Sequence, residues 1–543
     1  MFYVLLQLPL EDFLYSVNVA ECWSRRFSLQ SWRGRVGVSI DSVWGRSRAS
    51  VAATTIEAAR PASQPRTMLY RRSHRILNVV ISICLVGLFV VVLKGPSPDS
   101  IMMETPSFPL LPDMQLNRIK EVEANLINDT ISDYEGEIDL TSWSFFGSYS
   151  NLTISGQDVV MSVDFLNENF DLLNLAKFGP IEDVKFVIVV QVHNRPNYLA
   201  NLIDSLRQTK GIEETLLVFS HDINVSPVNE LIRNISFARV LQIFYPFNMQ
   251  IFPHVFPGQD PRDCPERLGK EAALASNCKN AQWPDKYGNY RVAKITQIKH
   301  HWWWKMNYVF DGIFDRYDLS NAWVLLLEED HYVVPDALYV LTDITRNRQK
   351  YCADCEIISL GSYLQSFSQY GATIANLGAQ PWYSSKHNMG MAFQRQSWIK
   401  VKNCSKLFCK YDDYNWDWSL MQVVAKCLPK PFRVIFTKSP RVIHIGDCGL
   451  HTHRCNAHNT YMSILSTISK HSDLLFPRRL AVTDVSHRSP KPSHENGGWG
   501  DIRDHALCKA NTYPLNKSYH RIPELRDLMQ SSVHFNHSAL RRE

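Results

Sequence analysis

The chain has 543 residues, of which 45% are hydrophobic and 20% are charged. This composition supports a large folded core and excludes disorder along the whole length. The formal net charge of +5 is small for this length, and no block rich in Lys and Arg marks a nucleic-acid surface. We therefore expect no nucleic-acid partner.

The first feature in chain order is an apolar segment, residues 76–93 (ILNVVISICLVGLFVVVL), without a charged residue. Its length is just sufficient to cross the hydrocarbon core of a membrane, so we predict a transmembrane signal anchor. Arg71, Arg72 and Arg75 precede it, which predicts a cytoplasmic N-terminal segment, residues 1–75. The alternatives are a buried core helix and a cleaved signal peptide, and the latter would need a shorter apolar run.

The regions on either side of this anchor carry weaker signals. Residues 1–67 show no sustained helical or strand period, and we assign them no function. Met68 begins a short basic sequence directly before the anchor, so we expect that translation can start there. Residues 94–180 contain few long apolar runs and many Ser, Pro, Asn and Asp residues, which is typical of an exposed spacer, here a lumenal stem.

Two further features agree with a lumenal location. Asn-X-Ser/Thr triplets occur at Asn128, Asn151, Asn234, Asn403, Asn516 and Asn536. After the anchor, an even number of cysteines favours a disulfide framework in an oxidising compartment. These are Cys264, Cys278, Cys352, Cys355, Cys404, Cys409, Cys427, Cys448, Cys455 and Cys508. Zinc at Cys352 and Cys355 is the alternative, but no second CxxC or paired His motif completes its ligands.

Residues 181–510 show the pattern of an α/β domain. Continuous apolar runs (KFVIVVQV, TLLVFS, AWVLLL) alternate with helical patterns that begin near Pro196 and Pro335. Such runs are typical of a mainly parallel sheet that is covered on both faces. Ligands bind at the carboxyl ends of strands in these sheets. The first candidate positions are therefore residues 191–195, 221–222 and 328–331.

Three consecutive carboxylates, Glu328, Glu329 and Asp330, directly follow the third apolar run. Their mutual repulsion requires compensation, which Mg2+ or Mn2+ would provide. A nucleotide diphosphate would supply further oxygen ligands, and the cation would neutralise its charge as a leaving group in sugar transfer. The alternative is a solvated acidic turn, but the position at the end of a strand favours the metal.

Two other positions suit the same chemistry. The sequence YDDYNWDW (residues 411–418) sets three carboxylates among aromatic residues, whose flat faces suit sugar rings. Asp417 is the candidate base, because an attacking hydroxyl must lose its proton. Alternatively, these aromatic residues belong to the core. His444 ends another strand-like run, and its neutral imidazole could complete an Mn2+ site.

The chain also carries a series of long motifs in a fixed order. They are QVHNRP (191–196), FSHD (219–222), FPGQDPRDCP (256–265), HHWWWK (300–305), LEEDH (327–331), HNMG (387–390), YDDYNWDW (411–418), GDCG (446–449) and NGGWGDIRDH (496–505). Together they resemble the N-acetylglucosaminyltransferase II family over roughly residues 184–509. The resemblance is specific, because many long motifs recur in order.

The resemblance implies an inverting, Mn2+-dependent glycosyltransferase of the GT-A fold in the Golgi membrane. It would transfer N-acetylglucosamine (GlcNAc) from UDP-GlcNAc, in beta-1,2 linkage, to the alpha-1,6-arm mannose of an N-glycan on a glycoprotein. The alternatives are the related transferase for the alpha-1,3 arm and a non-catalytic Golgi lectin. A glycoside hydrolase, which also uses paired carboxylates, is a third. The sequence leaves the oligomeric state open, a homo-oligomer included.

The resemblance also implies roles for single residues. Asp417 would be the base, and Asp330 and His444 would bind the metal. The donor site would contain Gln191, Val192, His193, Asn194, Arg195, Asp222, Gln297, Ile298, Lys299, His300, His301 and Glu329. The disulfides would pair Cys264 with Cys278, Cys352 with Cys355, Cys404 with Cys427, Cys409 with Cys508, and Cys448 with Cys455.

The chain departs from the family pattern in a few places. Ile298 stands where a smaller polar residue is expected, so donor affinity could differ while the chemistry is retained. Residues 1–67 and a C-terminal tail, residues 511–543, have no recognised counterpart.

Overall fold

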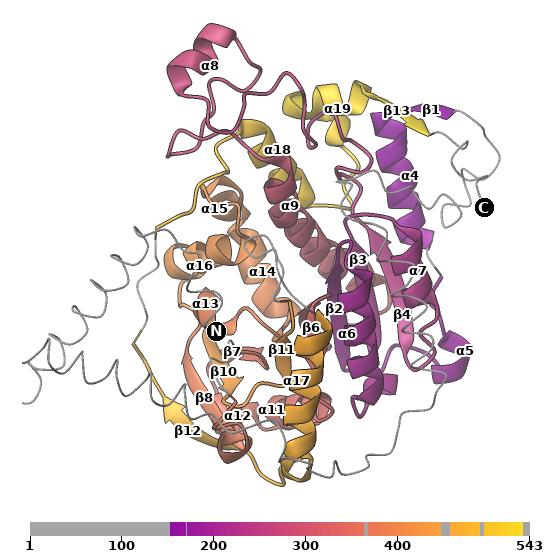
Figure 1. Cartoon of the computed structure of the whole chain (residues 1–543), viewed down its shortest axis with the longest axis vertical. Helices are drawn as coiled ribbons and strands as arrows, with labels where there is room; N and C mark the ends of the chain where they lie inside the picture. Colours follow the sequence, from indigo (N-terminus) through magenta and orange to yellow (C-terminus); the bar gives the residue numbers. More distant parts are fainter. Residues whose placement is uncertain (1–151, 170, 363–366, 447–456, 489–493, 536–543) are drawn as a thin grey trace, which may run out of the picture. The chain divides into compact units, whose positions relative to one another are not determined.

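The computed structural model describes residues 152–169, 171–362, 367–446, 457–488 and 494–535 (Figure 1). The predicted anchor, residues 76–93, lies outside these residues, and so does most of the predicted stem. Within the described part of the chain, no helix is both long enough and apolar enough to span a membrane.

The central element is a nine-stranded sheet in the order β12, β8, β10, β7, β9, β5, β2, β3, β4. Its strands are β2 (Phe186–Val192), β3 (Leu216–His221), β4 (Arg239–Phe244), β5 (Trp323–Glu328), β7 (Cys355–Ser359), β8 (Asn376–Pro381), β9 (Met391–Gln394), β10 (Arg433–Thr437) and β12 (Ala481–Val485). Strands β5, β2, β3 and β4 are parallel, and β9 runs antiparallel between β5 and β7. The predicted mainly parallel α/β fold is therefore confirmed.

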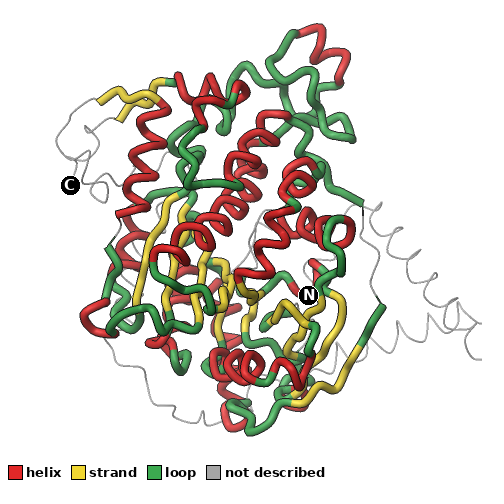
Figure 2. Tube along the Cα trace, turned by 180° about the vertical axis from the view of Figure 1, so that it is seen from behind, coloured by secondary structure: helices red, strands yellow, loops and turns green. Residues whose placement is uncertain are grey.

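Helices cover both faces of this sheet (Figure 1 and Figure 2). Alternate residues of β2 point into two separate cores, Val187 and Val189 into one and Ile188 and Val190 into the other. The first core is closed by α4 (Gly156–Asn169), α9 (Ala293–Tyr308), α14 (Arg395–Asn403), α16 (Trp416–Lys426) and α18 (Ile502–Asn511). The second is closed by α6 (Pro196–Gln208), α7 (Ser226–Arg233) and α11 (Ala337–Arg346). Helix α6 begins at Pro196, as the sequence predicts.

Helix α9 crosses the first core and is buried along most of its length. Trp302, Trp303 and Trp304 are all at most 1% exposed. Trp302 stacks on Trp416 with ring centroids 4.3 Å apart, which joins α9 to α16. Trp416 of YDDYNWDW therefore belongs to the core, the alternative that the sequence left open, and so do the three tryptophans of HHWWWK.

A short antiparallel pair outside the main sheet brings two distant segments together. Strand β6 (His331–Val333) follows the acidic residues after β5, and β11 (Val442–His444) pairs with it so that His444 lies opposite His331. The backbone N–H of Ile445 also donates to the carbonyl of Asp330. This pairing positions His444 beside the end of β5.

The folded region extends beyond residues 181 and 510, the predicted limits of the catalytic domain. Before the first limit, α4 buries Val159, Val160 and Val163 in the first core. Beyond the second, β13 (Ser532–Phe535) pairs with β1 (Leu152–Ser155). These segments are polar in composition, so the sequence did not predict that they belong to the folded domain. A few apolar residues in them are nevertheless spaced so that they reach the core.

Four disulfides occur among the described residues, and all four match pairs that the resemblance implied. They are Cys264–Cys278, Cys352–Cys355, Cys404–Cys427 and Cys409–Cys508. The fifth implied pair, Cys448 with Cys455, lies outside the described residues. Because Cys352 and Cys355 are bonded to each other, the zinc alternative is wrong at this position.

Candidate active site

A row of polar side chains marks the carboxyl ends of three neighbouring strands. Gln191 of β2 pairs in register with Ser220 of β3 on one side and Glu328 of β5 on the other. The alternation of each strand turns these side chains toward α9, as it does for Val189. The carboxyl ends of parallel strands are where this class of fold binds ligands.

The loop after β2 is tied to the neighbouring strand ends by charged hydrogen bonds. His193 Nδ1 lies 2.7 Å from Asp222 Oδ1, and the His193 backbone N–H donates to Glu329 Oε2. Arg195 donates through Nε to Glu329 Oε1 (2.5 Å) and through Nη1 to Asp330 Oδ2 (2.8 Å). Burial opposes the ionisation of Asp222, but the charges of His193 and His301 lower its pKa to about 2. The structure therefore brings His193, Arg195, Asp222, Glu329 and Asp330 together.

Asp330 and His444 meet at the end of β5, with His444 Nε2 3.2 Å from Asp330 Oδ2. The ligand atoms of Glu328, Asp330 and His331 also lie within 4.8 Å of one another, which is close enough for a shared cation. Burial opposes the ionisation of Asp330, but the hydrogen bond from His444 and the charge of Arg195 lower its pKa below the usual range. Asp330 is therefore an ionised, buried carboxylate, as a metal ligand must be.

Two observations show that a divalent cation fits this site. Asp330 Oδ1 is buried and has no hydrogen-bond partner among the described residues, although such atoms are normally satisfied. Gly446 leaves space directly beside the pair: a Cβ there would lie 2.2 Å from Asp330 Oδ2 and 2.9 Å from His444 Nε2. Any side chain at this position would displace the two ligands.

One face of α9 approaches the row of strand-end side chains. Gln297 Nε2 donates to Asp222 Oδ2, and His301 Nε2 lies 2.8 Å from Ser220 Oγ. Lys305 Nζ donates to Gln191 Oε1 at 2.9 Å. Lys305 was not among the site residues predicted from the sequence. Lys305 lies four residues after His301, just as His301 lies four residues after Gln297. This helical spacing puts the three side chains on one face of α9 and could have identified Lys305 as a site residue.

Other residues of the implied donor site have their side chains elsewhere. Val192 is buried in the second core, and Ile298 packs against the first. Lys299 donates to the carbonyl oxygens of Tyr411 and Asp413, and His300 contacts Asp504. Asn194 is exposed and lies just beyond β2. For Lys299 and His300 the structure places the side chains against segments other than the strand ends.

Asp417 lies in the first turn of α16 and is half-buried. Its Oδ2 accepts hydrogen bonds from Ser384 Oγ (2.6 Å) and Asn388 Nδ2 (3.0 Å), and its Oδ1 accepts one from the backbone of Trp418. Burial raises the pKa of Asp417 above its usual value, and these hydrogen bonds oppose the shift. A raised pKa suits a carboxylate that must accept a proton.

The other two carboxylates of YDDYNWDW have structural partners. Asp412 accepts hydrogen bonds from the backbone N–H groups of Lys286 and Trp499. Asp413 is buried and accepts hydrogen bonds from Asn415 and Asn496. Both therefore fix loops, which distinguishes Asp417 from its neighbours.

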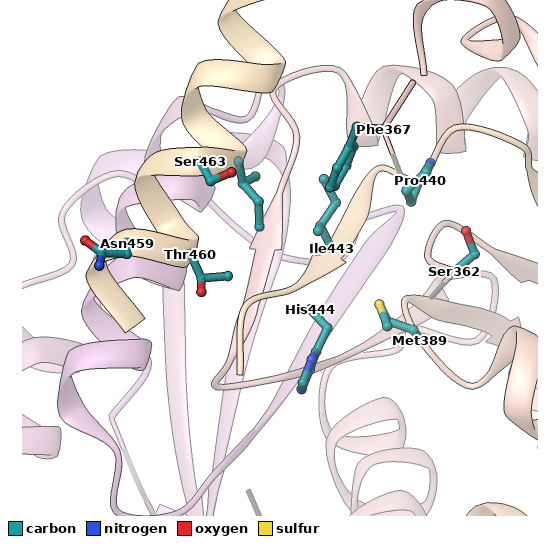
Figure 3. Close-up of a pocket in the computed structure, with 10 residues that line it drawn as sticks. Ser362, Phe367, Met389, Pro440, Ile443, His444, Asn459, Thr460 and Ser463 are labelled. Atoms are coloured by element: carbon teal, nitrogen blue, oxygen red, sulfur yellow. The ribbon is translucent and has the colours of Figure 1, made fainter. Parts of the chain in front are cut away.

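A cavity of about 420 Å³ lies beside His444. Asn459, Thr460 and Ser463 of α17 (Ala457–Lys470) lie on one side, Met389 lies across from them, and His444 lies between (Figure 3). This volume falls in the range of small-ligand sites. Because Met389 directly follows Asn388, which contacts Asp417, the HNMG loop connects the wall of the cavity with the candidate base.

Comparison with known proteins agrees with this arrangement. The sequence profile of the N-acetylglucosaminyltransferase II family matches residues 160–508. Curated relatives from Rattus norvegicus and Homo sapiens, both named alpha-1,6-mannosyl-glycoprotein 2-beta-N-acetylglucosaminyltransferase, are 43% and 42% identical. Each alignment covers 66% of this chain. The alignment covers 81% of the Rattus norvegicus protein and 80% of the Homo sapiens protein. The Arabidopsis thaliana protein of the same name is 33% identical over 63% of this chain and 77% of its own length. The chain belongs to the N-acetylglucosaminyltransferase II family.

Proposed function

We propose that the protein transfers GlcNAc from UDP-GlcNAc, with inversion and in beta-1,2 linkage, to the alpha-1,6-arm mannose of an N-glycan. The observation that carries this proposal is the pairing of Asp330 with His444 at the strand ends, in a chain whose relatives bear the name of this transferase. We propose Mn2+ for the site, because Mn2+ accepts both carboxylate oxygen and imidazole nitrogen. Acidic residues directly after a parallel strand support a GT-A type of fold.

Each group of site residues would have a separate role in the transfer reaction. When bound to Asp330 and His444, the cation would neutralise the charge of the diphosphate leaving group. His193, Arg195 and Asp222 would hold the nucleotide, with Glu329 fixing Arg195. Asp417 would take the proton of the acceptor hydroxyl as its oxygen bonds to the anomeric carbon and the bond from that carbon to the diphosphate breaks.

We also propose a single-pass type II protein of the Golgi membrane, with residues 76–93 as the anchor and the catalytic domain in the lumen. The four disulfides support an oxidising compartment. The related transferase for the alpha-1,3 arm remains the second candidate, and the names of the curated relatives favour the alpha-1,6 arm.

The decisive experiment uses the purified protein, UDP-GlcNAc and two defined N-glycans, one with GlcNAc already on the alpha-1,3 arm and one without. We expect transfer to the first glycan alone, in the presence of Mn2+, and no transfer after chelation. Transfer to the second glycan would favour the alpha-1,3-arm activity. Absence of transfer to both would contradict the proposal, whereas full activity after chelation would contradict its metal.

A further inference from the structure

Lys305 is a buried lysine beside the strand ends that form the candidate donor site. It is 1% exposed on α9, and its Nζ donates to Gln191 Oε1 at 2.9 Å. Burial lowers the pKa of Lys305 to about 7, and the nearby carboxylates of Glu328 and Asp222 oppose this shift. A buried ammonium without such partners would be costly, so this lysine is held in one place by the polar groups at the strand ends.

The chemistry of Lys305 determines how Gln191 is oriented. An ammonium group has three donors and no acceptor, whereas an amide presents an oxygen acceptor on one side and an NH2 donor on the other. In the structure the oxygen of Gln191 faces Lys305 Nζ, and protonated Lys305 holds the NH2 group of the amide pointing away from it. Because the two ends of an amide have nearly the same shape, hydrogen-bond partners decide which end faces which way.

Gln191 lies at the strand ends, where this class of fold binds ligands. Gln191 is half-buried near the carboxyl end of β2, next to Glu328 in register. Its Nε2 has no hydrogen-bond partner among the residues that the structure describes. A fixed N–H at this point suits an oxygen that has no proton of its own, such as a phosphate or a uracil carbonyl oxygen.

We propose that Lys305 is a positioning residue that fixes the amide of Gln191, so that this amide offers an N–H group to an oxygen of the nucleotide-sugar donor. The inference rests on the proposed function, which supplies the donor. Without Lys305 the amide could rotate by half a turn and present its oxygen, which would repel an anionic or carbonyl oxygen.

Lys299 provides a matched control on the same helix. It is also fully buried, and its ammonium donates to the backbone carbonyl oxygens of Tyr411 and Asp413. Those carbonyl groups cannot rotate as an amide side chain can. Lys299→Met therefore replaces another buried lysine of α9 with methionine and leaves Lys305, the partner of Gln191, in place.

The test is a double-mutant cycle in the full chain with Lys305→Met, Gln191→Met and both together. The readouts are the Kd for UDP-GlcNAc by calorimetry with Mn2+ present and the Tm of each variant. We expect each single substitution to raise Kd about tenfold, the effect of losing one charge-assisted hydrogen bond. The variant with both Lys305→Met and Gln191→Met should bind UDP-GlcNAc no more weakly than Gln191→Met alone. By contrast, any change in Kd caused by Lys299→Met should multiply the change caused by Gln191→Met.

Three outcomes would overturn the inference: an unchanged Kd for Gln191→Met, an unchanged Kd for Lys305→Met, or multiplicative effects of Lys305→Met and Gln191→Met. If Lys305→Met does not fold, Lys305→Leu takes its place under the same criteria, because leucine also has no hydrogen-bond donor. A wild-type protein that binds no UDP-GlcNAc would instead contradict the proposed function. The two failures are therefore distinguishable.

Discussion

Asp417 combines a raised pKa with three hydrogen bonds that hold its carboxylate in place. Asp417→Asn keeps the shape of the side chain but removes the proton acceptor. We expect kcat to fall by roughly 10²- to 10⁴-fold, while the Kd for UDP-GlcNAc stays close to that of the wild type. Steady-state kinetics and calorimetry measure the two effects. Retention of wild-type kcat would remove Asp417 from the role of base.

Ser384→Ala is the companion variant for Asp417. It removes one hydrogen bond that opposes the effect of burial, so the pKa of Asp417 should rise further. The acidic limb of the pH profile of kcat should then move to higher pH, because the base is ionised only above its pKa. An acidic limb that does not move in this variant would mean that it reports a different group.

A substitution at Gly446 tests the metal site through a steric effect, without removing a ligand. In Gly446→Ala, the new Cβ would stand 2.2 Å from Asp330 Oδ2 unless the loop shifts. We expect the Kd for Mn2+ to rise at least about tenfold, the order of the loss when support of metal ligands is removed. Calorimetric Mn2+ titration without donor measures this independently of activity. Gly269→Ala is a surface control, because Gly269 is exposed, its φ is −59°, and nothing lies within 4 Å of a Cβ at that position. Unchanged Mn2+ binding by Gly446→Ala would place the cation elsewhere.

Asp164 makes stability depend on pH. Burial in α4 raises its pKa from 3.8 to about 8, and its Oδ2 has no hydrogen-bond partner among the described residues. Between these two pKa values the unfolded chain releases a proton that the folded chain retains, so stability falls as pH rises from about 4 to about 8. Asp164→Asn cannot ionise. We therefore expect its Tm to exceed that of the wild type by an amount that grows from pH 5 to pH 8.

Differential scanning calorimetry at several pH values checks this prediction. Glu168→Gln on the same helix is the control, because Glu168 is partly exposed and lies 3.0 Å from Lys517. Its effect on Tm should be small, as for most surface ion pairs. A Tm difference between Asp164→Asn and wild type that stays constant with pH would show that Asp164 is ionised in the folded state.

At the scale of elements, the strands that carry the candidate site were the most predictable part of the chain. The runs that form β2, β3 and β5 are continuous and apolar because both faces of these strands are buried. That pattern is local, and it fixed where the strands end. The positions of Asp222, Glu329 and Asp330 at those ends therefore followed from sequence.

Pairings between distant segments could not be predicted in the same way. His444 reaches Asp330 because β11 pairs with β6, more than 100 residues away in the chain. Lys305 reaches Gln191 only because α9 packs under β2. The local period of either segment does not indicate its partner. The strand-like run before His444 suggested this residue as a possible metal ligand, and the family resemblance implied that it shares the metal with Asp330.

The C-terminal elements give a prediction at this scale. Beyond residue 510, Tyr519, Leu525 and Leu528 are buried in the first core. Truncation after Lys509 should abolish soluble, folded protein, because losing several buried apolar side chains costs several times the roughly 2 to 5 kcal/mol of one such loss. Truncation after Ser531 removes β13 and should lower Tm by far less. Solubility and calorimetry distinguish the two. An equal Tm for both truncations would mean that this segment does not stabilise the domain.

For the molecule as a whole, the proposed lumenal location has a direct chemical consequence at Asn234. This residue is exposed at the end of α7, and β4 begins at Arg239, so a glycan here would lie at the end of the sheet opposite the candidate site. We expect the protein from eukaryotic cells to lose mass on treatment with N-glycosidase, with deamidation at Asn234. Asn234→Gln should remove that glycan without changing transfer activity. If Asn234 and the likewise exposed Asn403 and Asn516 are all unmodified in such cells, the lumenal location is wrong.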